Sequence, residues 1–189
     1  MIILYILGAL IVAASVYAVV AYNLLVGAKN TVNAAWSDVE VQVKRRYDLV
    51  PNLVSAVKAY AAHESAVIEN AVKARTEAMS AQGGADEHYS AEKNLSKALK
   101  SLIAVSEKYP ELKASENFLK LQFELTDIED RIKASRRFYN TNVMDFNTRM
   151  EQFPCNIIAK HFKFKQADFF ELPHQESAAA SKPAEVKFK

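Results

Sequence analysis

The side chains that could do chemistry are few in this sequence, and their spacing does not fit the common catalytic or metal sites. His63 and Glu64 form half of an HExxH zinc motif, but Val67 stands where the second histidine is needed. No two histidines have a metal-ligand spacing; they are His63, His88, His161 and His174. The single cysteine, Cys155, excludes an intramolecular disulfide and a multi-cysteine zinc site. We therefore expect no metal centre.

Paired acids occur late in the chain, where acid–base catalysis is one interpretation and surface ion pairing is the other. Glu124, Asp127, Glu129 and Asp130 are followed by a run of basic residues at helical spacing, Arg131, Lys133, Arg136 and Arg137. Ion pairs three or four residues apart are typical of a solvated helix face. The sequence also lacks a glycine-rich phosphate loop and a GxSxG elbow. We predict that the protein is not an enzyme and needs no cofactor.

Composition favours a helical domain without nucleic-acid binding. The formal net charge is only +2 over 189 residues, so no basic nucleic-acid footprint is present. Four glycines and five prolines are too few for a loop-rich or β-rich fold. Alanine, lysine, glutamate and leucine dominate, as they do in helical bundles.

The first 28 residues contain no charged side chain. About 20 residues at 1.5 Å each cross a hydrocarbon core of roughly 30 Å, so this run is long enough for a transmembrane anchor, with its core at 2–21. A cleaved signal peptide is the alternative, but no basic residue precedes Ile2 and the run is longer than a signal core. Ala14, Ala18 and Ala21 form a small-residue stripe that allows two copies to pack, a weak indication of a homo-oligomer.

The flanking charges predict the orientation of this anchor. Lys29, Lys44, Arg45 and Arg46 follow the apolar run within about 20 residues, and only the terminal amine precedes it. We expect a single-pass protein of the bacterial inner (cytoplasmic) membrane, with its N-terminus outside and its domain in the cytoplasm.

Apolar spacing predicts an all-α fold in which the transmembrane helix runs into an elongated up-down bundle of four helices. The first helix ends at Pro51, since the residue before a proline is pushed out of the α region. The second runs from Pro51 to about residue 82, and the third from about Ser90 to just before Pro110. A heptad seam from Phe118 to Phe153 predicts a long fourth helix with coiled-coil character. An extended segment (155–172) and a disordered tail (173–189) follow, so the bundle domain is 22–172.

Polar residues around Pro51 are the candidate interaction or structural motif. Arg46, Asp48 and Asn52 flank the turn expected at Pro51, and Asn23 lies at the membrane-proximal end of the domain. The favoured interpretation is structural: Asp48 and Asn52 bond the exposed backbone of the turn, and Arg46 pairs with a carboxylate. A polar recognition site at the tip of the bundle is the alternative.

Several sequence blocks resemble the LemA family of bacterial membrane proteins. They are YNLLVGAKNTVNAAW (22–36), RYDLVPNLVSAVKAY (46–60), HE (63–64), ENAVKAR (69–75) and FYNTNVMDFNTRMEQFP (138–154). Together with the anchor, the resemblance covers about nine-tenths of the chain, and RYDLVPNLV is its most specific part. It implies a membrane-anchored, mostly helical bundle with no agreed molecular function, encoded near membrane metallopeptidases or other envelope proteins.

Two functions are therefore expected. The first is a membrane-anchored adaptor or scaffold that presents the bundle to an envelope protein. The second is a membrane-surface organiser that touches lipid through the Phe/Lys segment 160–170. Phe162 and Phe164 alternate with lysines, and such an apolar cluster must either cover the bundle or meet the membrane. Packing against the membrane-proximal end of the bundle is favoured for this segment.

Overall fold

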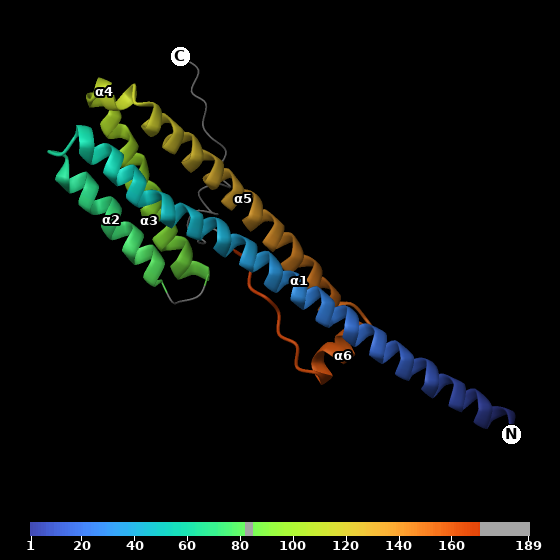
Figure 1. Cartoon of the computed structure of the whole chain (residues 1–189). Coiled ribbons are helices and arrows are strands. Elements are labelled where there is room, and N and C mark those ends of the chain that lie inside the picture. Colours follow the sequence, from blue (N-terminus) through green and yellow to red (C-terminus); the bar gives the residue numbers. More distant parts are fainter. Residues whose placement is uncertain (82–84, 171–189) are drawn as a thin grey trace, which may run out of the picture. The chain divides into compact units, whose positions relative to one another are not determined.

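The computed structural model describes residues 1–81 and 85–170, and these are helical without any strand, as the sequence predicted. The disordered tail predicted at 173–189 lies outside the described residues. The elements are α1 (Ile2–Tyr60), α2 (Ser65–Ser80), α3 (Ala85–Ala104), the 3-10 turn η1 (Val105–Lys108), α4 (Pro110–Lys113), α5 (Glu116–Glu151) and α6 (Cys155–His161) (Figure 1). They form two compact units. Unit 1 comprises Met1–Val41 and Lys133–Phe169, and unit 2 comprises the described residues of Gln42–Ile132 together with Phe170.

Helix α1 carries the apolar run and continues from it without a break. Among the described residues it is the helix that is long and apolar enough to cross a membrane. Its side chains before Ala21, the first buried residue, are exposed, apart from the half-buried Ala18. From there Leu25, Val32, Ala35 and Val39 are buried at steps of four, seven, three and four, which is one helical face. The change from an apolar surface to an amphipathic one therefore occurs within a single helix.

The predicted end of the first helix at Pro51 is wrong. Pro51 lies inside α1, which ends only at Tyr60, and the turn to α2 is made by residues 61–64. The turn that Asp48 and Asn52 were expected to cap is therefore not there. A proline in a helix interior removes one backbone hydrogen bond, so the carbonyl that loses its donor needs another one. A side chain of α2 supplies this donor, as described below.

Unit 1 packs the N-terminal part of α1 with the C-terminal part of α5. On this side the predicted seam residues Tyr139 and Phe146 are buried, together with Val143, whereas Phe153, the predicted end of the seam, is exposed and lies beyond α5. Helix α6 then lies beside α1 (Figure 1), followed by residues 162–169, which have no regular secondary structure. Residues 155–161 were predicted to be extended and are helical instead. The prediction failed there because the Phe/Lys alternation on which it was based begins only at Phe162.

Unit 2 contains one hydrophobic core, formed by the rest of α1, α2, α3, η1, α4 and the start of α5. Its largest fully buried side chains are Val50, Leu53, Val57, Leu95, Leu99, Leu102, Leu112 and Phe118. Helix α2 contributes small residues, Ala71, Ala74 and Ala78, which allow close helix packing. Phe170 is also buried, and its ring lies edge-on to Tyr89 with 6.3 Å between centroids.

Candidate functional site

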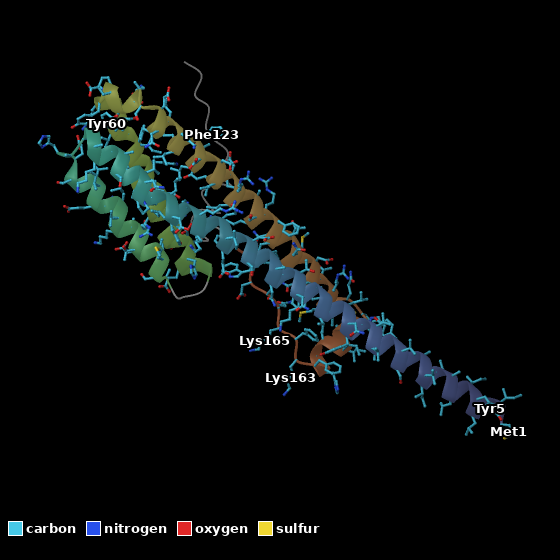
Figure 2. The ribbon with its side chains drawn as sticks, viewed as in Figure 1. Met1, Tyr5, Tyr60, Phe123, Lys163 and Lys165 are labelled. Carbon is cyan, nitrogen blue, oxygen red and sulfur yellow. The ribbon has the colours of Figure 1, made fainter. Side chains whose placement is uncertain are left out.

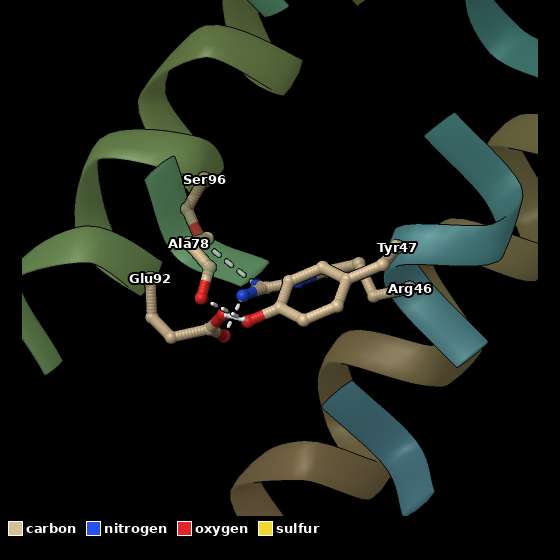
Figure 3. Close-up of polar contacts among 5 residues, drawn as sticks. All are labelled: Arg46, Tyr47, Ala78, Glu92 and Ser96. Atoms are coloured by element: carbon tan, nitrogen blue, oxygen red, sulfur yellow. Dashed lines mark hydrogen bonds and ion pairs between the residues drawn. The ribbon is translucent and has the colours of Figure 1, made fainter. Parts of the chain in front are cut away.

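A buried polar cluster joins three helices of unit 2 (Figure 3). Arg46 and Glu92, exposed by only 3% and 4%, form an ion pair between α1 and α3. Arg46 Nη1 also donates a hydrogen bond to Ser96 Oγ at 3.0 Å. The Tyr47 hydroxyl lies 2.5 Å from Glu92 Oε1 and 3.2 Å from the Ala78 carbonyl oxygen, which brings α2 into the same cluster.

This cluster fixes which helical turns face one another. A charge buried without its partner is costly, and removing one member of a buried pair typically costs 3–5 kcal/mol. Sliding α3 along α1 by one residue would separate Arg46 from both Glu92 and Ser96. The leucine and alanine contacts around the cluster are less directional, so the polar cluster specifies the register of α1, α2 and α3.

Arg75, a residue of α2, explains how helix α1 continues past Pro51. Pro51 has no N–H, so the carbonyl of Tyr47, four residues earlier, has no helical donor. Arg75 Nε donates to this carbonyl oxygen at 2.8 Å. The side chain of one helix thus replaces the missing backbone donor of another, and the helix continues to Tyr60.

The predicted site residues have different surroundings. Arg46 pairs with a carboxylate, as favoured from the sequence, and the partner is Glu92. Asp48, Pro51 and Asn52 are exposed on successive turns of α1, and Asp48 forms an i,i+4 ion pair with Lys44 at 2.9 Å. Asn23 belongs to unit 1, where it lines a shallow hollow of about 240 Å³. The structure therefore does not place Asn23 with the other four.

In unit 1, two side chains of α5 hold the segment that follows α6. We call residues 162–169 the strap. Asn147 makes a reciprocal pair of hydrogen bonds with the backbone of Ala167, at 2.9 and 3.0 Å. The Tyr139 hydroxyl donates to the Asp168 carbonyl oxygen at 2.8 Å, and burial, followed by the nearby Asp168 carboxylate, raises the pKa of Tyr139. Trp36 lies edge-on to the Tyr139 ring, with centroids 5.4 Å apart.

The strap also packs aromatic rings against α1. Phe162 and Phe164 lie 4.6 and 5.9 Å from Tyr22, centroid to centroid, and Phe164 contacts Phe146 at 6.5 Å. This agrees with the predicted packing of the Phe/Lys segment on the bundle. An open groove of about 670 Å³ runs between the strap and α1, and Lys29, Lys163 and Lys165 line it.

Sequence reasoning missed the partners in both places, namely Tyr47, Arg75, Glu92, Tyr139 and Asn147. One signal was available, because a proline inside a helical pattern needs a donor for the carbonyl four residues before it. Both Tyr47 and Arg75 stand in the blocks that carry the family resemblance. Nothing in the spacing of Glu92 or Asn147 marks them. Within 1–81 and 85–170, no three histidine, cysteine, aspartate or glutamate residues are placed to hold a metal ion.

Comparisons with known proteins agree on one family. The model of the LemA family matches residues 35–188. Magnetosome proteins MamQ 1 and MamQ 2 of Paramagnetospirillum magneticum are each 27% identical, over 86% of this chain and 67% of their own length. Magnetosome protein MamQ of Magnetospirillum gryphiswaldense is 26% identical, over 79% of this chain and 64% of its own.

Proposed function

Because the chain belongs to the LemA family, we propose that it is a membrane-anchored, non-catalytic adaptor that presents its helical domain to a protein partner in the cell envelope. The observation that carries the proposal is the continuity of α1. One helix includes both the exposed apolar run and the buried face that packs in unit 1. A domain joined to its anchor in this way is held at the membrane surface without a flexible linker.

We infer further that the anchor lies in the bacterial inner membrane with the domain in the cytoplasm. The orientation is supported by the distribution of basic residues, since Lys29 and the basic residues at 44–46 all follow the apolar run. The names of the similar magnetosome proteins state where those proteins belong and give no reaction. This fits an adaptor better than an enzyme.

An apolar pair on α5 is the surface of unit 2 that suits a protein partner. Phe123 is 75% exposed and projects from α5 (Figure 2), and Leu119, one turn earlier, is also exposed. Aromatic side chains are enriched at the centres of protein interfaces, where their burial contributes most of the affinity. The exposed Phe123 therefore marks where the partner binds.

The test is the size of the complex that the full chain forms in detergent-solubilised native membranes. We expect a complex heavier than the chain itself, which the double variant Leu119→Ser/Phe123→Ser dissociates. The control is Lys97→Ser/Lys100→Ser, which changes two exposed residues of α3 and should leave the complex intact. A species of one chain only would contradict the adaptor role. A mass that is a multiple of this chain would identify self-association in place of a different partner.

A further inference from the structure

We propose that α6 and the start of the strap form a platform at the membrane interface that binds anionic phospholipid head groups. The platform comprises residues 153–165. The inference rests on the membrane anchoring in the function proposed above, and it is independent of the protein partner. It names a ligand, the lipid surface itself, for a part of unit 1 distinct from the exposed pair on α5.

Two contacts fix the level of α6 along the anchor. The Tyr17 hydroxyl donates to Cys155 Sγ at 3.8 Å, so the first residue of α6 lies level with Tyr17, near the end of the predicted core span 2–21. Phe162, just after α6, packs against Tyr22, five residues further along α1, with the two rings tilted. Five residues of helix rise by about 7–8 Å. The two contacts therefore hold α6 beside the last turns of the predicted core span, where an apolar face can enter the boundary between head groups and acyl chains.

The platform exposes two large apolar side chains. Phe153 is 80% exposed and Ile157 is 57% exposed, although large apolar side chains of this kind are rarely left to water in neighbouring positions. Helix α6 lies beside the part of α1 that has lipid as its surroundings on the proposed function (Figure 1). Lipid acyl chains at the interface cover these two side chains without requiring another protein.

Lysine side chains gather at the platform. Lys29, Lys163 and Lys165 line the groove between the strap and α1, and none of them has a carboxylate partner in the part of the chain that the structure describes. Figure 2 shows Lys163 and Lys165 directed away from α1. Two acids lie in this region: Glu151 accepts a hydrogen bond from Gln166 at 2.8 Å, and the Asp168 carboxylate lies near Tyr139. Ammonium groups at this level attract the phosphates of an anionic leaflet.

Depth-dependent fluorescence quenching in the full chain tests the platform. Trp36→Phe removes the single native tryptophan. A reporter is then placed at one exposed position at a time, by Ile157→Trp on α6, Leu10→Trp in the apolar run or Val41→Trp further along α1. Each chain is placed in nanodiscs whose phosphatidylcholine carries bromine on the acyl chains. We expect strong quenching at positions 10 and 157 and little at 41.

Each outcome decides between the two proposals. If the reporter at position 10 is quenched but the reporter at 157 is quenched as little as the one at 41, the platform is overturned and the anchor stands. No quenching at 10 contradicts the anchoring itself, and the platform with it. If Trp36→Phe alters the melting temperature, a spin label on Ile157→Cys in a Cys155→Ser chain that keeps Trp36 measures the same depth through its accessibility to oxygen.

The head-group preference is measured with the same reporter. Nanodiscs contain either brominated phosphatidylglycerol or brominated phosphatidylcholine at equal mole fraction. We expect the anionic lipid to quench position 157 at least about twofold more strongly, because each lysine near the surface adds about fivefold to anionic-lipid binding. Lys163→Gln/Lys165→Gln should abolish the difference, and Lys97→Gln/Lys100→Gln should not. Equal quenching by both lipids in the unaltered platform would overturn the head-group site.

Discussion

At Tyr47 the backbone carbonyl accepts a hydrogen bond from Arg75 Nε because Pro51, four residues on, has no N–H to offer. The sequence predicted a helix end at Pro51 from the proline alone. Whether a proline ends a helix or is accommodated depends on a donor elsewhere in the chain, and Arg75 lies 28 residues away. Local pattern alone could not supply that information.

Arg75→Met should destabilise the protein only when Pro51 is present. Losing a charged hydrogen bond to a part-buried carbonyl costs about 1.5–3 kcal/mol of unfolding free energy. Pro51→Ala restores an N–H donor to Tyr47, so Arg75→Met in that background should cost at least about 1 kcal/mol less. Denaturant unfolding of the full chain in detergent measures all four proteins, with Lys73→Met on the same helix as a control. Equal costs in both backgrounds would show that Arg75 does not substitute for the proline.

Glu92→Gln should be among the most damaging single changes in unit 2. It leaves the Arg46 guanidinium buried without its counter-charge, at a cost of about 3–5 kcal/mol. Arg46→Met/Glu92→Leu removes both charges and should cost less than Glu92→Gln alone. The same unfolding measurement separates the cases. A double variant that is less stable than the single one would mean that the pair contributes net stability and not only register.

Asp48→Ala and Asn52→Ala should each change the unfolding free energy by less than about 0.5 kcal/mol, because both residues are exposed in a helix interior. The sequence interpretation, in which they cap a turn, predicts a loss of about 1 kcal/mol for each. A loss of that size would mean that α1 is interrupted at Pro51 in solution.

At the scale of elements, periodicity predicted the long helices well. The seam that begins at Phe118 is buried along α5 at Leu121, Leu125, Ile132, Tyr139 and Phe146. Such a pattern is local, so the sequence alone reveals it. Helix α6 was missed because seven residues are too few for a period to be recognised, and because the neighbouring Phe/Lys alternation indicates an extended chain.

Asn147 is expected to control how firmly the strap is held. Asn147→Ala removes both hydrogen bonds to Ala167, while Tyr139 and the aromatic contacts remain. Local opening of the strap should therefore become more frequent although the helices keep their structure. Limited trypsin digestion of the full chain in nanodiscs, followed by mass spectrometry, should show faster cleavage after Lys163 or Lys165. Thr148→Ala, an exposed neighbour on α5, is the control and should digest like the parent.

For the whole molecule, the family, the all-α fold and the membrane association agree between sequence, structure and comparisons. The composition of the first 28 residues and the spacing of the later apolar residues are sufficient to predict the membrane association and the all-α fold, and the family follows from the sequence blocks that resemble LemA proteins. The partner could not be predicted in this way, because an interface also depends on the surface of a second molecule, which produces no periodicity or motif in this sequence. Phe123 could be recognised as an exposed candidate for the interface only from the structure, which shows which of its neighbours on α5 are buried.

The predicted topology follows from the lysine and arginine bias around the anchor. A reporter that is active only in the cytoplasm, fused after Lys189, should be active in the full chain, and an export-dependent reporter at the same position should be silent. Reversing the charge bias by adding basic residues before Ile2 should lower the first signal. An active export-dependent reporter in the parent chain would place the domain on the other side of the membrane.

The most direct test of the adaptor function is site-specific photocrosslinking in native membranes. The crosslinking amino acid p-benzoylphenylalanine replaces Phe123 in the full chain, and Asn117, an exposed residue near the start of α5, is replaced in a separate control. An adaptor predicts one discrete protein adduct from position 123, much weaker from position 117 and absent without irradiation. Adducts with lipid alone, or equal and diffuse labelling from both positions, would contradict the account.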